Sequence, residues 1–110
     1  MNSMLTKPKL ECLGALVWSF GVANRLENDC QFTNDITKMI QLFRSGDWGN
    51  IDENDWELNV GTCKNKSGGS LMGAYKTFDN TRIWIITSGY GQQALGRDYC
   101  YTTVLFPEEY

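Results

Sequence analysis

The chain has 110 residues, of which 42% are apolar, so one core of ordinary domain size is expected. Its formal charge of −3 and pI near 4.8 disfavour binding to a phosphate backbone. The chain has no histidine, which excludes Ser–His and Cys–His catalysis and His-ligated zinc, and we expect no enzyme.

The first residues carry little structural signal. Met1–Lys9 is polar and contains Pro8, so we predict a mobile tail or an edge segment before a single domain that spans residues 1–110. No apolar segment followed by a small-residue cleavage site is visible, which predicts a cytoplasmic protein. No apolar run reaches the roughly 18 residues that a membrane span requires.

The next segment predicts one strand and one short helix. Leu13–Phe20 is apolar and aromatic, and we expect it to form a strand that pairs with strands near the C-terminus. Val22–Asn28 is predicted to be a short helix, with Val22, Ala23 and Leu26 on one side.

The clearest helix signal covers Thr33–Arg44. Apolar residues recur there at helical spacing, namely Phe32, Ile36, Met39, Ile40 and Phe43. Thr33 or Asn34 is the predicted N-cap, and Gly46 suits the position just after the helix. We expect the apolar stripe of this helix to pack on one face of a sheet.

The segment Ser45–Thr62 carries acidic residues and no lysine or arginine. Its acids are Asp47, Asp52, Glu53, Asp55 and Glu57. We predict that Asp52 caps a short helix over Glu53–Leu58 and that a loop follows over Val60–Gly69. Two interpretations remain open: a solvated acidic surface, or a surface that docks on a basic partner which normally holds nucleic acid.

Three further strands are predicted over Ser70–Phe78, Thr81–Tyr90 and Tyr99–Phe106, since these runs are rich in β-branched and aromatic residues. Arg82–Thr87 is apolar on both alternating faces, which predicts a central strand. The short helix near Asp52 or a partner would cover its second face. Gly89–Asp98 is predicted to be a long loop, either functional or an insertion.

The predicted fold class is therefore α+β. We expect an antiparallel sheet of about four strands, with one main helix and a short second helix packed on it.

The chain has four cysteines, Cys12, Cys30, Cys63 and Cys100, and none belongs to a C-x-x-C pair. They could pack as small apolar side chains. Alternatively, because they lie near the ends of predicted elements, they could converge on one structural zinc ion held by four thiolates. No other cofactor is expected.

Several motifs resemble a widespread family of small proteins carried by phages, plasmids and integrated elements of bacteria. The similarity covers residues 20–110, and the motifs are Ser45-Gly46-Asp47-Trp48-Gly49, Ala74-Tyr75, Ile83-Trp84-Ile85-Ile86-Thr87 and the end segment Thr102–Tyr110. Some members are labelled as a type I restriction methylation subunit, but this chain is too short for a methyltransferase. The four cysteines are not part of the family pattern, and the segments Cys63–Gly69 and Gly89–Asp98 are longer than is usual in it.

The resemblance implies an accessory protein of a mobile element. Small acidic proteins of such elements include anti-CRISPR proteins, and from this context we predict an inhibitory protein that binds and blocks a type II Cas effector nuclease. We expect no direct contact with nucleic acid or with a membrane. The predicted partner-binding residues are Asp47, Asp52, Glu53, Asp55, Glu57, Gln92, Gln93 and Arg97.

The alternative is an accessory protein that acts in replication or nucleic-acid handling. For that function, five basic residues would have to form one patch, namely Lys64, Lys66, Lys76, Arg82 and Arg97. A third class, an enzyme based on a thiol or a carboxylate, would need a cysteine of depressed pKa in a cleft, which the sequence does not indicate.

Overall fold

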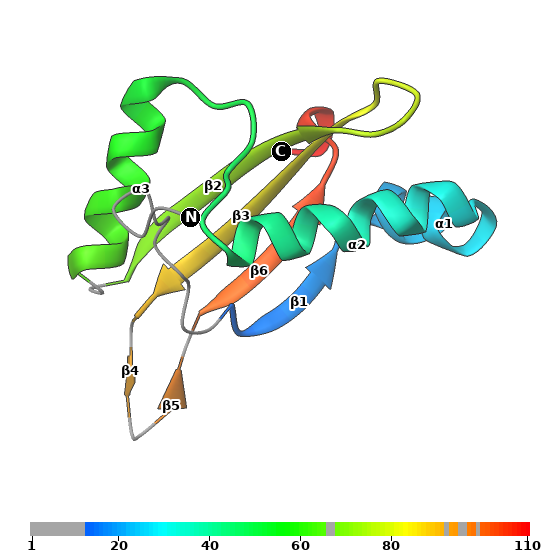
Figure 1. The fold of residues 1–110 in the computed structure, drawn as a ribbon. Coiled ribbons are helices and arrows are strands. Elements are labelled where there is room, and N and C mark those ends of the chain that lie inside the picture. The colour runs from blue at the N-terminus through cyan, green and yellow to red at the C-terminus, as the bar shows by residue number, and fades with distance from the viewer. Residues whose placement is uncertain (1–12, 66–67, 92, 95–96, 99) are drawn as a thin grey trace.

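The computed structural model describes residues 13–65, 68–91, 93–94, 97–98 and 100–110. In these residues the chain forms an α+β fold, as predicted (Figure 1). The elements are β1 (Ala15–Trp18), α1 (Phe20–Asn28), α2 (Cys30–Arg44), α3 (Glu53–Asn65), β2 (Gly69–Lys76), β3 (Arg82–Tyr90), β4 (Gln93–Ala94), β5 (Arg97–Asp98), β6 (Tyr101–Leu105) and the 3-10 turn η2 (Pro107–Glu109). No helix within the described ranges is long and apolar enough to cross a membrane.

The main sheet has the strand order β1-β6-β3-β2. β3 is central and antiparallel to both of its neighbours, which confirms its predicted position. The prediction of a purely antiparallel sheet is wrong, because β1 runs parallel to β6, from Ala15 opposite Tyr101 to Trp18 opposite Val104. Three helices connect β1 to β2, and such a helical crossover allows β1 and β2 to run in the same direction.

α2 begins earlier than predicted. The N-cap is Asp29, whose Oδ1 accepts a hydrogen bond from the backbone N–H of Phe32 at 3.0 Å, and not Thr33 or Asn34. The Thr33 hydroxyl instead donates to the carbonyl groups of Leu26 and Asp29. Asp29 alone separates α1 from α2, and its short acidic side chain satisfies an amide of the second helix.

α3 is longer than predicted, since it continues through most of the loop predicted over residues 60–69. Val60 and Cys63 are partly buried against the core, and this packing outweighs the weak helix propensity of Gly61 and its polar neighbours. The start of the helix is as predicted, because the Asp52 carboxylate accepts a hydrogen bond from the N–H of Asp55 at 2.8 Å.

The core lies between α2 and one face of the sheet. It contains apolar residues of every element that borders it, namely Val22, Phe32, Ile36, Met39, Phe43, Trp48, Leu71, Tyr75, Ile83, Ile85, Tyr90 and Val104. Burying each large apolar side chain contributes about 1.5–3 kcal/mol. Trp48 is fully buried and packs edge-on against Trp56 of α3, with ring centroids 4.8 Å apart.

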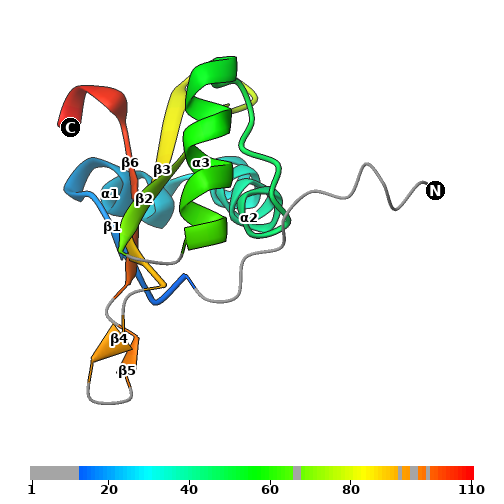
Figure 2. The same ribbon diagram turned by 90° about the vertical axis from the view of Figure 1, so that its left-hand side faces the viewer.

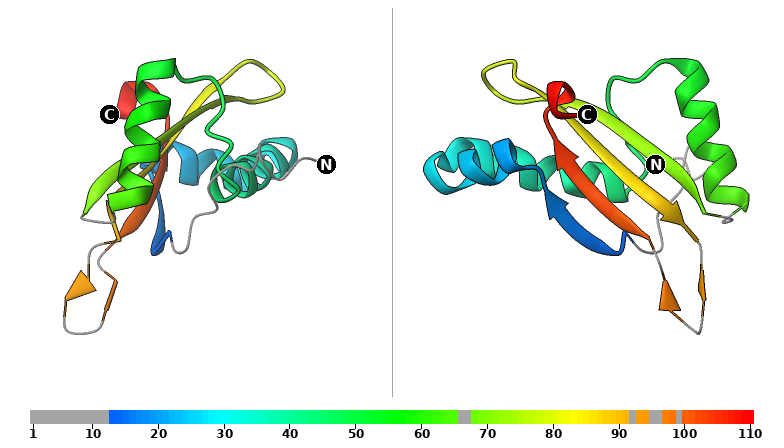
Figure 3. Two further views of the ribbon diagram at one scale, coloured as in Figure 1. Left: turned by 60° about the vertical axis from the view of Figure 1, so that its left-hand side comes forward. Right: turned by 180° about the vertical axis from the view of Figure 1, so that it is seen from behind.

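α2 and α3 lie on the same side of the sheet, with α3 beside the edge strand β2 (Figure 2). From behind, the four strands lie in front of α2, and η2 is seen against this face at one end (Figure 3). α3 therefore does not cover the second face of β3, which was one of the two covers expected from the sequence.

Asn59 fastens α3 to the edge of β2. Its side-chain amide donates to the carbonyl oxygen of Met72 at 2.8 Å and accepts from the N–H of Met72 at 3.1 Å. The Asn59 side chain thus replaces a neighbouring strand at this position. Asn59 is itself buried, so its polar atoms depend on these two hydrogen bonds.

We predict that Asn59→Ala lowers the free energy of unfolding by about 1–3 kcal/mol, because the buried Asn59 side chain no longer makes its two hydrogen bonds to the main chain of Met72. Asn54→Ala is the matched control, since Asn54 is exposed on the same helix, and it should change stability by less than ~0.5 kcal/mol. Urea denaturation measures both variants. Equal stability of the two would contradict this role of Asn59.

Candidate functional site

The acidic residues predicted to bind a partner fall into two groups. Asp47 lies in the turn after α2, where its carboxylate accepts from the N–H of Gly49 at 3.2 Å and its carbonyl oxygen accepts from the Tyr75 hydroxyl at 2.8 Å. The other four residues, Asp52, Glu53, Asp55 and Glu57, are here called the acidic helix start. Asp47 therefore shapes a turn, whereas the acidic helix start forms one surface.

The acidic helix start is held at the N-terminal end of α3. Glu53 and Glu57 are exposed neighbours one helical turn apart, and acids in the first turn interact favourably with the helix dipole. The ion pairs within the described part of the chain join Arg25 to Asp29 and to Asp79. The carboxylates of the acidic helix start thus have no cationic partner there.

The predicted loop over residues 89–98 contains a small hairpin. β3 extends to Tyr90, and β4 then pairs with β5, with Gln93 opposite Asp98 and Ala94 opposite Arg97. The hairpin projects beyond one end of the sheet, and α3 begins at the other end (Figures 1 and 2). Gln92 lies outside the described residues. The structure therefore does not bring the two predicted halves of the docking surface together.

The cysteines predicted as zinc ligands are spread over different elements. Cys30 is exposed at the start of α2, Cys63 lies in the last turns of α3, and Cys100 is buried just before β6. Cys12 lies outside the described residues. In the part of the chain that the structure describes, no three Cys, Asp or Glu side chains form a metal-binding group. The zinc site stays a prediction.

Two of the five basic residues considered for nucleic-acid binding lie side by side. Lys76 and Arg82 are exposed and directly opposite each other in β2 and β3. Lys64 lies at the end of α3, Arg97 lies in β5 of the hairpin, and Lys66 is outside the described residues. Only the positions of Lys76 and Arg82 thus support a common patch.

Sequence reasoning did not identify the sheet face that α2 and α3 leave uncovered among the described residues. Strand alternation places the following residues on the face turned away from α2, here called the open sheet face: Met72, Ala74, Lys76, Arg82, Trp84, Ile86, Tyr101 and Thr103. Trp84 packs edge-on against Tyr110, with ring centroids 5.6 Å apart. The apolar residues between Ile83 and Thr87 were the available signal, but they predicted a covered face.

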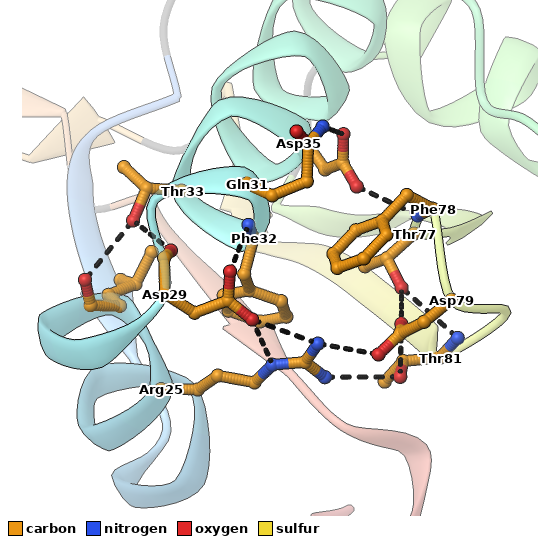
Figure 4. A network of polar contacts seen from close by, with 11 residues as sticks. Arg25, Asp29, Gln31, Phe32, Thr33, Asp35, Thr77, Phe78, Asp79 and Thr81 are labelled. Atoms are coloured by element: carbon orange, nitrogen blue, oxygen red, sulfur yellow. Dashed lines mark hydrogen bonds and ion pairs between the residues drawn. The ribbon is translucent and has the colours of Figure 1, made fainter.

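A polar clamp holds the β2–β3 turn against α1 and α2 (Figure 4). The Arg25 guanidinium contacts the carboxylates of Asp29 at 3.2 Å and Asp79 at 2.7 Å, and it donates to the Thr81 hydroxyl at 3.1 Å. It also lies over the Phe32 ring, 4.4 Å from the centroid. The clamp fixes the turn next to a groove between α2 and β2.

Hydrogen bonds also lower the pKa of Asp79. Its carboxylate accepts from the hydroxyls of Thr77 and Thr81 as well as from Arg25. These hydrogen bonds hold the pKa of Asp79 well below its ordinary range.

The chain matches no protein-family model, no curated protein and no solved structure. The assignment to a mobile-element family stays a prediction.

The clamp predicts a specific loss of stability in acid. Since the folded pKa of Asp79 is below its unfolded value of about 3.9, its contribution is present above that pH and is lost as the pH falls through the folded pKa. Between about pH 5 and pH 2, Asp79→Asn should therefore show a shallower fall in unfolding free energy than the wild type. Urea denaturation over this pH range tests it, with Glu27→Gln, at an exposed carboxylate, as the control. Parallel profiles for Asp79→Asn and the wild type would contradict the clamp.

Proposed function

We propose that this chain is a binding protein of a bacterial mobile element that inhibits a type II CRISPR effector nuclease. The acidic helix start would dock on a basic surface of the nuclease that normally accepts nucleic acid. The observation that supports this proposal is a group of four carboxylates, fixed at one end of α3 and without cationic partners among the described residues. The motifs that resemble small mobile-element proteins agree with it.

The carboxylates are presented by a firmly anchored helix. Trp56 packs against buried Trp48, and Asn59 is hydrogen-bonded to the backbone of Met72. Association then requires little ordering of the helix, which lowers the entropic cost of binding. The net charge of −3 also favours binding, because it attracts a basic partner over a longer range.

Unpaired surface carboxylates contribute more to the association rate and to specificity than to affinity. Their effect is screened by salt, with a Debye length of about 8 Å at physiological ionic strength. The proposal therefore requires a binding rate that falls as salt increases.

The direct test is guide-directed DNA cleavage by a purified type II Cas nuclease, with this protein in increasing excess. We expect dose-dependent loss of cleavage. The double variant Glu53→Lys/Glu57→Lys should slow association by about tenfold and flatten its salt dependence. Asp52 is left unchanged because its carboxylate caps α3.

The matched control is Glu27→Lys/Glu108→Lys, which makes the same charge change at exposed positions outside α3. It should inhibit more strongly than the α3 variant. Undiminished cleavage by the wild type would remove the type II nuclease as the target. Equal inhibition by the two double variants would remove the acidic helix start as the docking surface.

A second function is favoured by one observation on the open sheet face. Lys76 and Arg82 lie opposite each other, and Trp84 is two residues from Arg82 on the same face. Cationic side chains beside an aromatic ring are the elements with which many proteins bind single-stranded nucleic acid. We therefore propose single-strand binding on the open sheet face as the alternative function.

This alternative predicts that a fluorescent single-stranded oligothymidylate binds at low salt and that Lys76→Ala/Arg82→Ala weakens the binding by about tenfold. Arg44→Ala/Lys64→Ala removes the same charge at two other exposed positions and serves as the control. Fluorescence anisotropy measures all three proteins. Absence of binding, or equal binding by both variants, would exclude the open sheet face as a nucleic-acid site.

A further inference from the structure

The outer edge of β2 is closed at Met72 and at Ala74 by hydrogen bonds from other elements. The Asn59 side chain occupies both outward main-chain groups of Met72. At Ala74, the N–H donates to the carbonyl oxygen of Trp48 at 3.0 Å, and the carbonyl oxygen accepts from the N–H of Asn50 at 2.7 Å. These contacts satisfy an edge that would otherwise be open to another strand.

Lys76 is the next residue whose main chain points outward. In an antiparallel pair, hydrogen-bonded residues alternate with residues that direct their N–H and C=O away from the partner strand. The N–H of Thr77 donates to the carbonyl oxygen of Thr81 at 2.9 Å, so Lys76, opposite Arg82, belongs to the second kind. Ala74, two residues before Lys76, also directs its N–H and C=O outward, as this alternation requires.

Beyond Lys76 the edge is closed again. The N–H of Phe78 donates to the Asp35 carboxylate of α2 at 2.8 Å (Figure 4). No residue in the described ranges hydrogen-bonds to the outward N–H and C=O of Lys76. Lys76 is thus an opening between two closed positions, Ala74 and Phe78.

The opening leads into a groove between α2 and β2 with a volume of about 550 Å³. Met39 and Leu42 of α2 line one wall, and Ala74 and Phe78 line the other. Leu42 is 42% exposed and Phe78 is 58% exposed, so two large apolar side chains face solvent at this groove. Such a site can accept an apolar side chain of a ligand.

The charges of the groove select the kind of ligand. Lys38 of α2 borders it on one side, and Lys76 borders it at the edge of β2, from which its side chain projects on the open sheet face. Neither lysine has an ion pair among the described residues. Asp35, the acid in its lining, already accepts hydrogen bonds from the N–H of Phe78 and from the side chain of Gln31. A lysine at a strand edge disfavours pairing with another apolar edge, whereas a carboxylate would neutralise it.

We propose that this groove binds an extended peptide segment of another protein, in which a large apolar residue stands next to an acidic residue. One residue of the segment pairs its N–H and C=O with those of Lys76 and so adds a short strand to the sheet. The apolar side chain lies between Leu42 and Phe78, and the carboxylate interacts with Lys38 or Lys76. This site lies apart from the acidic helix start and does not depend on the nuclease proposal.

The first test is selection from a random heptapeptide phage-display library against the wild-type protein. We expect enriched sequences in which an acid adjoins an aromatic or large aliphatic residue. The most enriched peptide is then synthesised and titrated into ¹⁵N-labelled protein. The amide signal of Lys76 should shift and become protected from solvent exchange, because it gains a hydrogen bond.

Charge-reversed variants show whether the peptide uses the two lysines. Lys38→Glu/Lys76→Glu should weaken binding by about tenfold or more, since two attractive charges become repulsive. Arg44→Glu/Lys64→Glu carries the same charge change at exposed positions outside the groove lining and should bind like the wild type. The ¹⁵N spectra of both variants report whether they are folded.

Recognition of the main chain is tested by N-methylation of the peptide at each residue in turn. Methylation of the residue that pairs with Lys76 removes a donor and should abolish binding, whereas its immediate neighbours, whose N–H groups point the other way, should tolerate it.

The proposal is overturned if no sequence is enriched, if the selected peptide leaves the Lys76 amide unchanged, or if it binds Lys38→Glu/Lys76→Glu as tightly as the wild type. None of these measurements contains a nuclease, so failure of the nuclease proposal and failure of the peptide groove are distinguished.

Discussion

The hydrogen bonding of the outer edge of β2 determines how the helical part of the chain is placed. A strand at the edge of a sheet has main-chain donors and acceptors that need partners, and here they come from three places. The segment before α3 pairs with Ala74, Asn59 of α3 binds Met72, and Asp35 of α2 binds the N–H of Phe78. Because these partners belong to different elements, closing the edge fixes α2, α3 and the segment between them relative to the sheet.

Both candidate surfaces follow from this arrangement. α3 is fastened by Asn59 and by the Trp48–Trp56 contact, and the acids at its start are therefore held on a rigid support beside the sheet. The groove exists because the segment before α3 closes the edge at Ala74, while α2 meets it again at Phe78. Lys76 is left between these two closures, where a ligand in extended conformation can reach it.

Features set by local sequence could be predicted. The apolar stripe of α2, the Asp52 cap of α3 and the central position of β3 follow from periodicity, capping chemistry and the apolar character of both strand faces. Features set by contacts between distant residues could not. The length of α3 depends on packing against the core and on the Asn59–Met72 contact, and the parallel direction of β1 depends on its pairing with β6. The groove was also not predicted. The N–H and C=O of Lys76 stand out as unpaired only when the hydrogen bonds of Ala74 and Phe78 on either side are known.

The edge of β2 is closed at Met72 and Ala74 and open at Lys76. Native-state hydrogen exchange of the individual backbone amides, followed by NMR, measures this most directly. We predict slow exchange for the amides of Met72 and Ala74, which are hydrogen-bonded across the edge, and fast exchange for the amide of Lys76 between them and the turn. A Lys76 amide as strongly protected as that of Ala74 would show that the edge is closed there too, and would contradict both the opening and the peptide groove built on it.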